Sequence, residues 1–327
     1  MFQRRERAWT ALALDEANTE LRRGMGAERT LKAGPIAETL AAARGFQAQA
    51  RALGVAALPA YATSAVRKAV NPQDLLGPLG ALGIEAKVLS EEDEGRLNLL
   101  GATARLGAGR TPRRAPDTPG VGPLGVPFAR PDQPPLPHDP SPSYLIIDPG
   151  GDSTECTADL DGGGWQSARV ASLPFGSVSL QEAHGSATDN DPIQWARLET
   201  ARAAAQAAAS AHPMFGAFVG VGLIPAIRVN APIQRALEQV NGRTRAAHGQ
   251  GGAYARVELE RLCRATAALD HAGRAALLEG EPIGKVDRTC YGFASWLGIL
   301  DALGAEAFEV EPWGIKLGAV IALNGLA

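Results

Sequence analysis

The segment DPGGDSTE at residues 148–155 has the composition of a phosphate-binding turn. An apolar run, YLII, leads directly into it, as a buried strand leads into a turn. Gly150 and Gly151 let backbone N–H groups approach an anion without a Cβ in the way. The hydroxyls of Ser153 and Thr154 can donate hydrogen bonds to phosphate oxygens. The pattern is therefore suited to the binding of a phosphate group.

Two carboxylates flank the same turn. Asp148 precedes the glycines and Glu155 follows the hydroxyl residues. Both can bind Mg²⁺, directly or through water, because hard cations prefer carboxylate oxygens. DPGG is also favourable chemistry for a plain hairpin turn. The residues alone leave the phosphate and metal site and the simple turn equally open.

A second acidic segment, SEEDEGRL, occupies residues 90–97. Ser90 is a suitable N-cap, and four consecutive acids at the start of a helix complement its macrodipole. A solvent-exposed helix terminus explains this composition without any function. The alternative is that one of the carboxylates positions or deprotonates a water molecule.

A third segment, ATSAVR, places hydroxyls at the end of a short strand and Arg67 one helical step later, with Asn71 following. An arginine can bind an anion through two parallel N–H groups. Taken alone, Arg67 is better explained as a surface residue.

The elements that position these segments alternate between strands and helices. Apolar residues at helical spacing, with Pro35 near the start, predict a helix over 35–53. Strand and helix patterns then alternate in both halves of the chain, which predicts an α/β architecture with two lobes. The other predicted strands are 8–14, 55–61, 83–89, 144–147, 154–160, 165–173, 216–222 and 307–311, and the other helices are 65–70, 91–105, 192–211, 257–269, 291–303 and 315–323.

Proline is concentrated between the two halves. Eleven of the 23 prolines fall between Pro112 and Pro142. This composition is typical of a linker or surface insertion with polyproline character. We therefore predict an N-terminal lobe at 1–106, a Pro-rich insertion or linker at 107–143 and a C-terminal lobe at 144–327.

Composition excludes several classes of function. A net charge of −3 provides no basic field for duplex nucleic acid. No run of about 18 apolar residues is present, which argues against a membrane-spanning helix. Three widely spaced cysteines without ligand spacing argue against a zinc site or a disulfide framework. These features, and a charged N-terminus without an apolar signal core, predict a cytoplasmic protein.

The three motifs, in this order, resemble those of the exopolyphosphatase / guanosine pentaphosphate phosphatase (Ppx/GppA) family, which belongs to the actin-like ATPase superfamily. The family patterns are roughly ATSAxRxAxN, GIxxxxISGxEEARL and DxGGGSTE, and further similarity covers SLPFGSVSL and two C-terminal pieces. The resemblance spans about residues 22–325. The matching segments are 62–71, 83–97, 148–155, 172–180, 283–288 and 313–318.

The resemblance implies a two-lobed actin-like (ribonuclease H-like) fold with an interlobe cleft. It implies Mg²⁺-dependent release of terminal phosphate from polyphosphate or guanosine pentaphosphate, by a protein for which a homodimer is plausible. By position, Glu94 would be the catalytic base for the attacking water, while Asp148 and Glu155 would hold metal and water. The residues expected to bind substrate phosphates are Arg67, Gly150, Gly151, Ser153 and Thr154.

The sequence also departs from the family patterns. A DxGSNS-like first phosphate loop is missing before Arg22, and a GxGGTxT-like loop expected at 220–225 has lost its second glycine and its threonine. Asp152 replaces the third glycine of DxGGGST and adds negative charge beside the phosphate site. A second hypothesis is therefore a degenerate, non-catalytic phosphate- or nucleotide-binding or interaction protein of the same fold. A third is that translation begins upstream of Met1.

Overall fold

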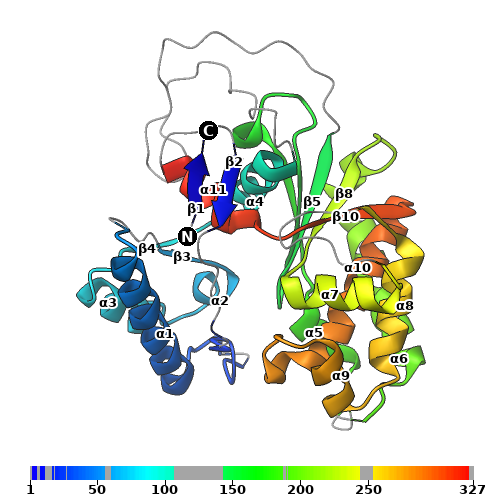
Figure 1. The fold of residues 1–327 in the computed structure, drawn as a ribbon, viewed down its shortest axis with the longest axis horizontal. Coiled ribbons are helices and arrows are strands. Elements are labelled where there is room, and N and C mark those ends of the chain that lie inside the picture. The colour runs from blue at the N-terminus through cyan, green and yellow to red at the C-terminus, as the bar shows by residue number, and fades with distance from the viewer. Residues whose placement is uncertain are drawn as a thin grey trace. The chain divides into compact units, whose positions relative to one another are not determined.

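A computed structural model gives the fold of the chain (Figure 1). It describes residues 2–5, 8–11, 17, 19–26, 28–55, 60–106, 143–186, 189, 191–243 and 253–323. The chain divides into two compact units, Met1–Glu94 and Gly95–Ala327. The division falls inside a helix, whereas the sequence predicts it at the end of that helix. Apart from residue 143, the predicted Pro-rich insertion lies outside the described residues.

The N-terminal unit contains two small sheets and three helices within its described residues. Strand β1 (Phe2–Arg5) pairs antiparallel with β2 (Ala8–Ala11), and β3 (Ala60–Ala62) pairs parallel with β4 (Ala86–Val88). The predicted long helix and the strand near 83–89 are confirmed, and the first part of strand 55–61 lies outside the described residues. The helices of this unit are α1 (Ala33–Ala52), α2 (Ser64–Arg67) and α3 (Gln73–Ala81).

A compact apolar cluster holds the N-terminal unit together. Asn71, which ends the ATSAxRxAxN pattern, connects this cluster to the chain before α1. Its side-chain oxygen accepts a hydrogen bond from the Leu31 N–H at 2.8 Å, and its side-chain nitrogen donates to the Leu31 carbonyl at 3.1 Å. Asn71 is therefore a structural residue here. The buried members of the cluster are Met25, Leu31, Ile36, Val66, Leu75, Leu79 and Ile84.

The C-terminal unit is built on a six-stranded sheet with the order β7-β6-β5-β8-β10-β9. The three central strands β5, β8 and β10 are parallel, and β5, β6 and β7 form an antiparallel meander. The central position of β5 explains its continuous apolar sequence, because both faces of a central strand are covered. The strands are β5 (Tyr144–Pro149), β6 (Thr154–Ala158), β7 (Arg169–Leu173), β8 (Ile224–Arg228), β9 (Ala253–Ala255) and β10 (Ala307–Glu311).

Helix α10 is the central helix of this unit, and it packs against α5, α6 and α8 (Figure 1). A Cβ at Gly298 would lie 2.5 Å from the Arg202 carbonyl oxygen of α6, so glycine permits the close approach of these two helices. Among the described residues, no helix is long and apolar enough to cross a membrane. The helices are α4 (Glu91–Leu106), which starts in the N-terminal unit, α5 (Ser177–His184), α6 (Trp195–Ala211), α7 (Ala231–Val240), α8 (Arg256–Ala267), α9 (His271–Leu277), α10 (Val286–Leu303) and α11 (Gly314–Leu323).

Glycines also fix the position of α4 within the C-terminal unit. A Cβ at Gly101 would overlap the carbonyl oxygen of Gly314, and a Cβ at Gly318 would overlap that of Leu97. A Cβ at Gly95 would lie 2.5 Å from Thr157 Oγ1 on β6. Helix α4 therefore lies in close contact with both α11 and the meander from Gly95 onward.

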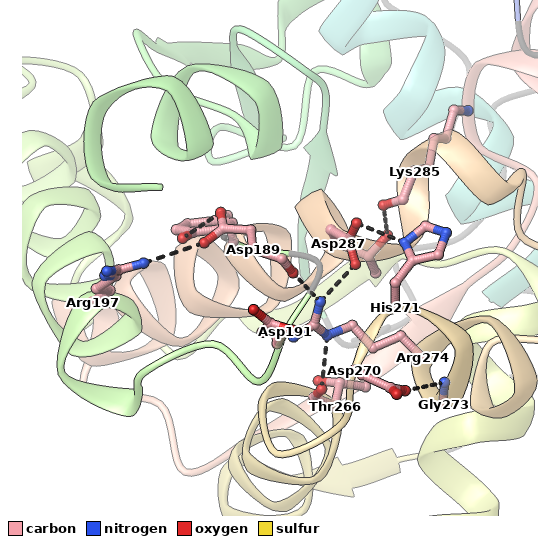
Figure 2. A network of polar contacts seen from close by, with 12 residues as sticks. Asp189, Asp191, Arg197, Thr266, Asp270, His271, Gly273, Arg274, Lys285 and Asp287 are labelled. Atoms are coloured by element: carbon pink, nitrogen blue, oxygen red, sulfur yellow. Dashed lines mark hydrogen bonds and ion pairs between the residues drawn. The ribbon is translucent and has the colours of Figure 1, made fainter. Parts of the chain in front are cut away.

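A buried arginine connects the loop after α5 to the helices α8 to α10 (Figure 2). Arg274 is 0% exposed. Its guanidinium donates to the carboxylate of Asp287 at 2.6 Å and to the carbonyls of Asp189 at 2.5 Å, Asp191 at 2.7 Å and Thr266 at 3.0 Å. A guanidinium carries five N–H donors, so this one side chain satisfies several buried acceptors at once.

The Asp189 and Asp287 carboxylates extend this network. Asp189 accepts a hydrogen bond from the Tyr291 hydroxyl at 3.0 Å and pairs with Arg197 at 3.4 Å. Asp287 lies 2.8 Å from Nδ1 of His271. Burial, with the Asp189 carboxylate next in importance, raises the pKa of the Tyr291 phenol. Tyr291 therefore remains a neutral donor throughout the ordinary pH range.

The prediction of a strand at 216–222 is wrong. Residues Phe215–Phe218 form a 3₁₀ turn in which the two phenylalanine rings pack edge to face at 6.2 Å. The glycines at 220 and 222 have φ angles of 74° and 76°, which strands do not use. The strand of this region is β8, which begins at Ile224. The glycines of the loop expected at 220–225 therefore precede the strand instead of following it. The residues that follow β8 are Val229 and Asn230.

Candidate functional site

The DPGGDSTE segment is a tight hairpin turn between β5 and β6. The Gly150 N–H donates to the Ser153 carbonyl at 2.9 Å. Asp148 and Glu155 are direct cross-strand partners. The turn interpretation is therefore correct for the backbone, and the turn also brings the two predicted metal ligands to opposite positions on neighbouring strands.

Asp148 is 6% exposed, and both of its carboxylate oxygens accept hydrogen bonds. Oδ2 accepts from Asn98 Nδ2 of α4 at 2.5 Å, and Oδ1 accepts from Nε of Arg228, the last residue of β8. The Asn98 side-chain oxygen accepts from the backbone N–H of Ile315 at 2.7 Å. Asp148 is thus oriented by residues from three separate elements.

Glu155 is 2% exposed and is oriented by the next strand of the meander. The Ser172 hydroxyl, its cross-strand partner on β7, donates to Oε1 at 3.2 Å. The following residue, Cys156, is fully buried, and burial raises the pKa of its thiol. Cys156 therefore remains a neutral thiol and has no role as a nucleophile, in agreement with the sequence interpretation.

The loop carbonyls cap helix α5. The Gly150 carbonyl accepts from the Ser177 N–H at 3.1 Å, and the Gly151 carbonyl accepts from the Val178 N–H at 2.9 Å. A Cβ at Gly176 would lie 2.5 Å from the Gly150 oxygen, so only glycine allows this approach. The glycine of SLPFGSVSL is therefore required for the shape of the DPGGDSTE turn.

The two hydroxyl residues of the turn have different surroundings. Thr154 is fully buried, and its hydroxyl donates to the Phe175 carbonyl at 2.9 Å. The Thr154 hydroxyl proton, which the sequence predicts to bind a phosphate oxygen, is therefore donated to a backbone carbonyl. Ser153 is also buried, and its carbonyl closes the hairpin.

The N-terminal unit brings the other two motifs together. Nη1 of Arg67 lies 3.1 Å from the Glu94 carboxylate and 2.7 Å from the Leu89 carbonyl, while Nη2 lies 3.4 Å from Glu91. The side chain of Arg67 is 18% exposed and that of Glu94 is 11% exposed. Ser90 Oγ accepts from the Asp93 N–H at 3.0 Å, which confirms the predicted N-cap. Arg67 thus holds the carboxylate of Glu94.

The sequence motifs do not predict Asn98 and Arg228 as site residues. Asn98 lies one helical turn after Glu94, so the (i, i+4) spacing places both on the same face of α4. That spacing was the available signal for Asn98. Arg228 ends the strand that the sequence predicts at the wrong position, so its place beside Asp148 followed from no sequence pattern.

Comparisons with known proteins agree with the sequence motifs. The model of the Ppx/GppA phosphatase family matches residues 2–111. A search among curated proteins gave no match.

Solved structures with the same fold cover nearly the whole chain. An exopolyphosphatase from Cytophaga hutchinsonii has a TM-score of 0.76 at 16% identity, and the match covers 100% of this chain and 94% of that one. The Ppx/GppA family member from Aquifex aeolicus has a TM-score of 0.66 at 17% identity, with 94% and 86% covered. An exopolyphosphatase-like protein has a TM-score of 0.72 at 18% identity, with 97% and 92% covered.

These matches confirm the predicted fold class, an α/β fold of the actin-like ATPase type. The family match covers the N-terminal segment, and the shared fold extends over both units. The chain is therefore similar to the Ppx/GppA phosphatase family over residues 2–111 and shares the fold of these solved structures over nearly its whole length.

Proposed function

We propose that this chain is a Mg²⁺-dependent phosphoanhydride hydrolase that releases terminal phosphate from polyphosphate or guanosine pentaphosphate. The observation that carries the proposal is the pair of buried carboxylates, Asp148 and Glu155, opposite each other at a glycine turn. The match of the Ppx/GppA phosphatase family model to residues 2–111 supports the reaction class, and one of the solved structures with this fold is an exopolyphosphatase.

The donor set fits a hard divalent cation. Asp148 and Glu155 both offer carboxylate oxygens, the ligand type that Mg²⁺ prefers. Each carboxylate oxygen can accept more than one bond, so the bonds from Asn98 and Arg228 leave acceptor capacity on Asp148. When bound, Mg²⁺ would neutralise charge on the phosphate oxygens.

Glu94 is proposed as the base that accepts a proton from the attacking water. The Arg67 guanidinium pairs with this carboxylate and limits its rotamers. The proton removed from water would reside on a Glu94 carboxylate oxygen, and the water oxygen would form the new bond to the terminal phosphorus. The bond between that phosphorus and the bridging oxygen would break, and the shortened substrate would leave with this oxygen. Such catalysis depends mainly on positioning and charge neutralisation.

Arg67 and the hairpin turn are proposed to bind the substrate phosphates. The contacts of Arg67 with Leu89, Glu91 and Glu94 use three of the five N–H donors of its guanidinium. The Gly150 N–H and the Thr154 hydroxyl have backbone partners within the protein, which favours Gly151 and Ser153 as donors.

The alternative, a non-catalytic binding protein, is favoured by two observations. Asp148 has a cationic partner within the chain, Arg228, and Asp152 adds negative charge to the turn. Binding of a phosphate compound without turnover would then raise the melting temperature while releasing no phosphate.

Phosphate release from polyphosphate and from guanosine pentaphosphate, measured with Mg²⁺, tests the proposal. We expect Glu94→Gln to lower the rate by about 10²–10⁴-fold, because it removes the base. Glu92→Gln is the matched control, since Glu92 lies in the same helical turn but is exposed, and its rate should stay at the wild-type level. No release from either substrate by folded wild-type protein would overturn the hydrolase proposal. Equal release by both variants would overturn the role of Glu94.

A further inference from the structure

Arg228 lies at the centre of a row of charged residues at the carboxyl ends of the three parallel strands. Asp148, Arg228 and Glu311 lie near the ends of β5, β8 and β10. The register pairs Ile147 with Ile227 and Arg228 with Glu311. The strand order therefore places a guanidinium between two buried carboxylates.

The two carboxylates have different partners. Glu311 is fully buried and accepts the backbone N–H groups of Trp313 at 3.0 Å and Gly314 at 2.6 Å, which start α11. Asp148 accepts Nε of Arg228 and the side-chain amide of Asn98. The charge of Asp148 is therefore balanced by a cation that belongs to the chain.

The space for this arginine depends on Gly314. A Cβ there would lie 2.7 Å from both Arg228 Cδ and Asn98 Oδ1, and the φ angle of 44° also favours glycine. The Arg228 side chain is 31% exposed, whereas Asp148 is almost completely buried. Three elements, α4, β8 and α11, thus shape one position for a guanidinium against Asp148.

We propose that Arg228 is an internal counter-cation that competes with the divalent cation for Asp148 and so sets the metal affinity of the site. This inference rests on the metal site of the proposed function. A divalent cation on Asp148 is repelled by Arg228 or must displace it. Two cations close to one carboxylate repel each other, so a guanidinium paired with Asp148 lowers the affinity of this carboxylate for a metal ion.

Metal titration of the full-length, chelator-treated protein tests this proposal. Mg²⁺ affinity is measured by calorimetry and Mn²⁺ affinity by electron paramagnetic resonance. We expect Arg228→Met to raise both affinities by about tenfold or more, while Arg228→Lys, which retains the charge, stays close to wild type. Arg235→Met is the matched control, because the Arg235 guanidinium on α7 donates to the Glu279 carbonyl instead.

Combining Arg228→Met with Asp148→Asn should abolish the gain, because the competition acts on Asp148. An unchanged or weaker affinity in Arg228→Met, or a gain that survives Asp148→Asn, would overturn the inference. If Arg228→Met does not fold, Arg228→Gln removes the charge while retaining a hydrogen-bond donor, and the same gain is expected. If Arg228→Met raises the Mn²⁺ affinity but the wild-type protein releases no phosphate, only the proposed function is overturned. If the wild-type protein shows Mg²⁺-dependent release but Arg228→Met leaves the affinity unchanged, only this inference is overturned.

Discussion

At the scale of single residues, polar groups in this protein act in orienting pairs. Asn98 uses its amide nitrogen on Asp148 and its amide oxygen on the N-terminus of α11, so one side chain fixes a carboxylate and a helix together. Arg67 joins the second and third motifs by its contacts with Glu91 and Glu94. The three motifs thus contribute to positioning as well as to the proposed chemistry.

Arg274 offers a prediction for stability. Arg274→Ala would leave Asp287 and two backbone carbonyls of the 189–191 segment without their donor, and we expect a loss of about 3–5 kcal/mol in the free energy of unfolding. Arg169→Ala is the control, because the Arg169 side chain is 46% exposed and pairs with Asp161, which is also exposed. Its cost should stay below about 1 kcal/mol.

Urea denaturation of both variants measures these costs. Equal midpoints for the two variants would contradict the structural role assigned to Arg274. A change in the slope of the transition would indicate a change in the unfolded state as well.

Several residues of the site were predictable because their signals are local. The apolar run at 144–147, the glycine turn after it and the cap at Ser90 each depend on neighbours in the sequence, and the structure places all three as predicted. Arg228 was not predictable, because strand pairing over a long sequence separation places it beside Asp148. The prediction of a strand at 216–222 is wrong because the apolar residues at 215–218 form a 3₁₀ turn.

At the scale of elements, glycines determine how closely helices approach. Helix α4 packs on α11 through Gly101 and Gly318, and α10 packs on α6 through Gly298. These glycines do not appear as a signal in hydrophobic periodicity, because the absence of a side chain is what the packing requires. The sequence predicts these helices but not which of them are in contact.

Gly101→Ala tests the contact of α4 with α11. The added methyl group would overlap the Gly314 carbonyl, and overpacking of this kind costs about 1–3 kcal/mol. Gly45→Ala in α1 is the matched control, since a Cβ there meets nothing within 4 Å. It should stabilise the protein by about 0.5–1 kcal/mol, because alanine is the better helix former.

Thermal unfolding distinguishes the two glycine variants by the sign of the shift. Melting temperatures that move in the same direction would contradict the packing account of Gly101. A lower melting temperature for Gly101→Ala alone would agree with it.

At the scale of the whole molecule, the chain divides into two compact units, and the boundary between Glu94 and Gly95 falls within one helix. The proposed base is the last residue of one unit, and the carboxylates at the hairpin belong to the other. Cys156, Cys263 and Cys290 are all buried as free thiols in the C-terminal unit. A homodimer and a cytoplasmic location remain predictions from the sequence.

The hairpin that pairs Asp148 with Glu155 has a consequence for the order of folding. Its strands are neighbours in sequence, whereas Asn98 and Arg228 reach Asp148 across separations of 50 and 80 residues. Long loops close at a larger entropic cost, and pairings of this kind form slowly. We therefore expect the carboxylates of Asp148 and Glu155 to come together before Arg228, which neutralises Asp148, reaches them.

The ion pair should accordingly be absent from the folding transition state. We expect Arg228→Met to accelerate unfolding more than it slows refolding, as for any contact formed late. Stopped-flow measurements over a range of urea concentrations give both rates. A variant that refolds slowly but unfolds at the wild-type rate would show instead that this contact forms early, within the folding nucleus.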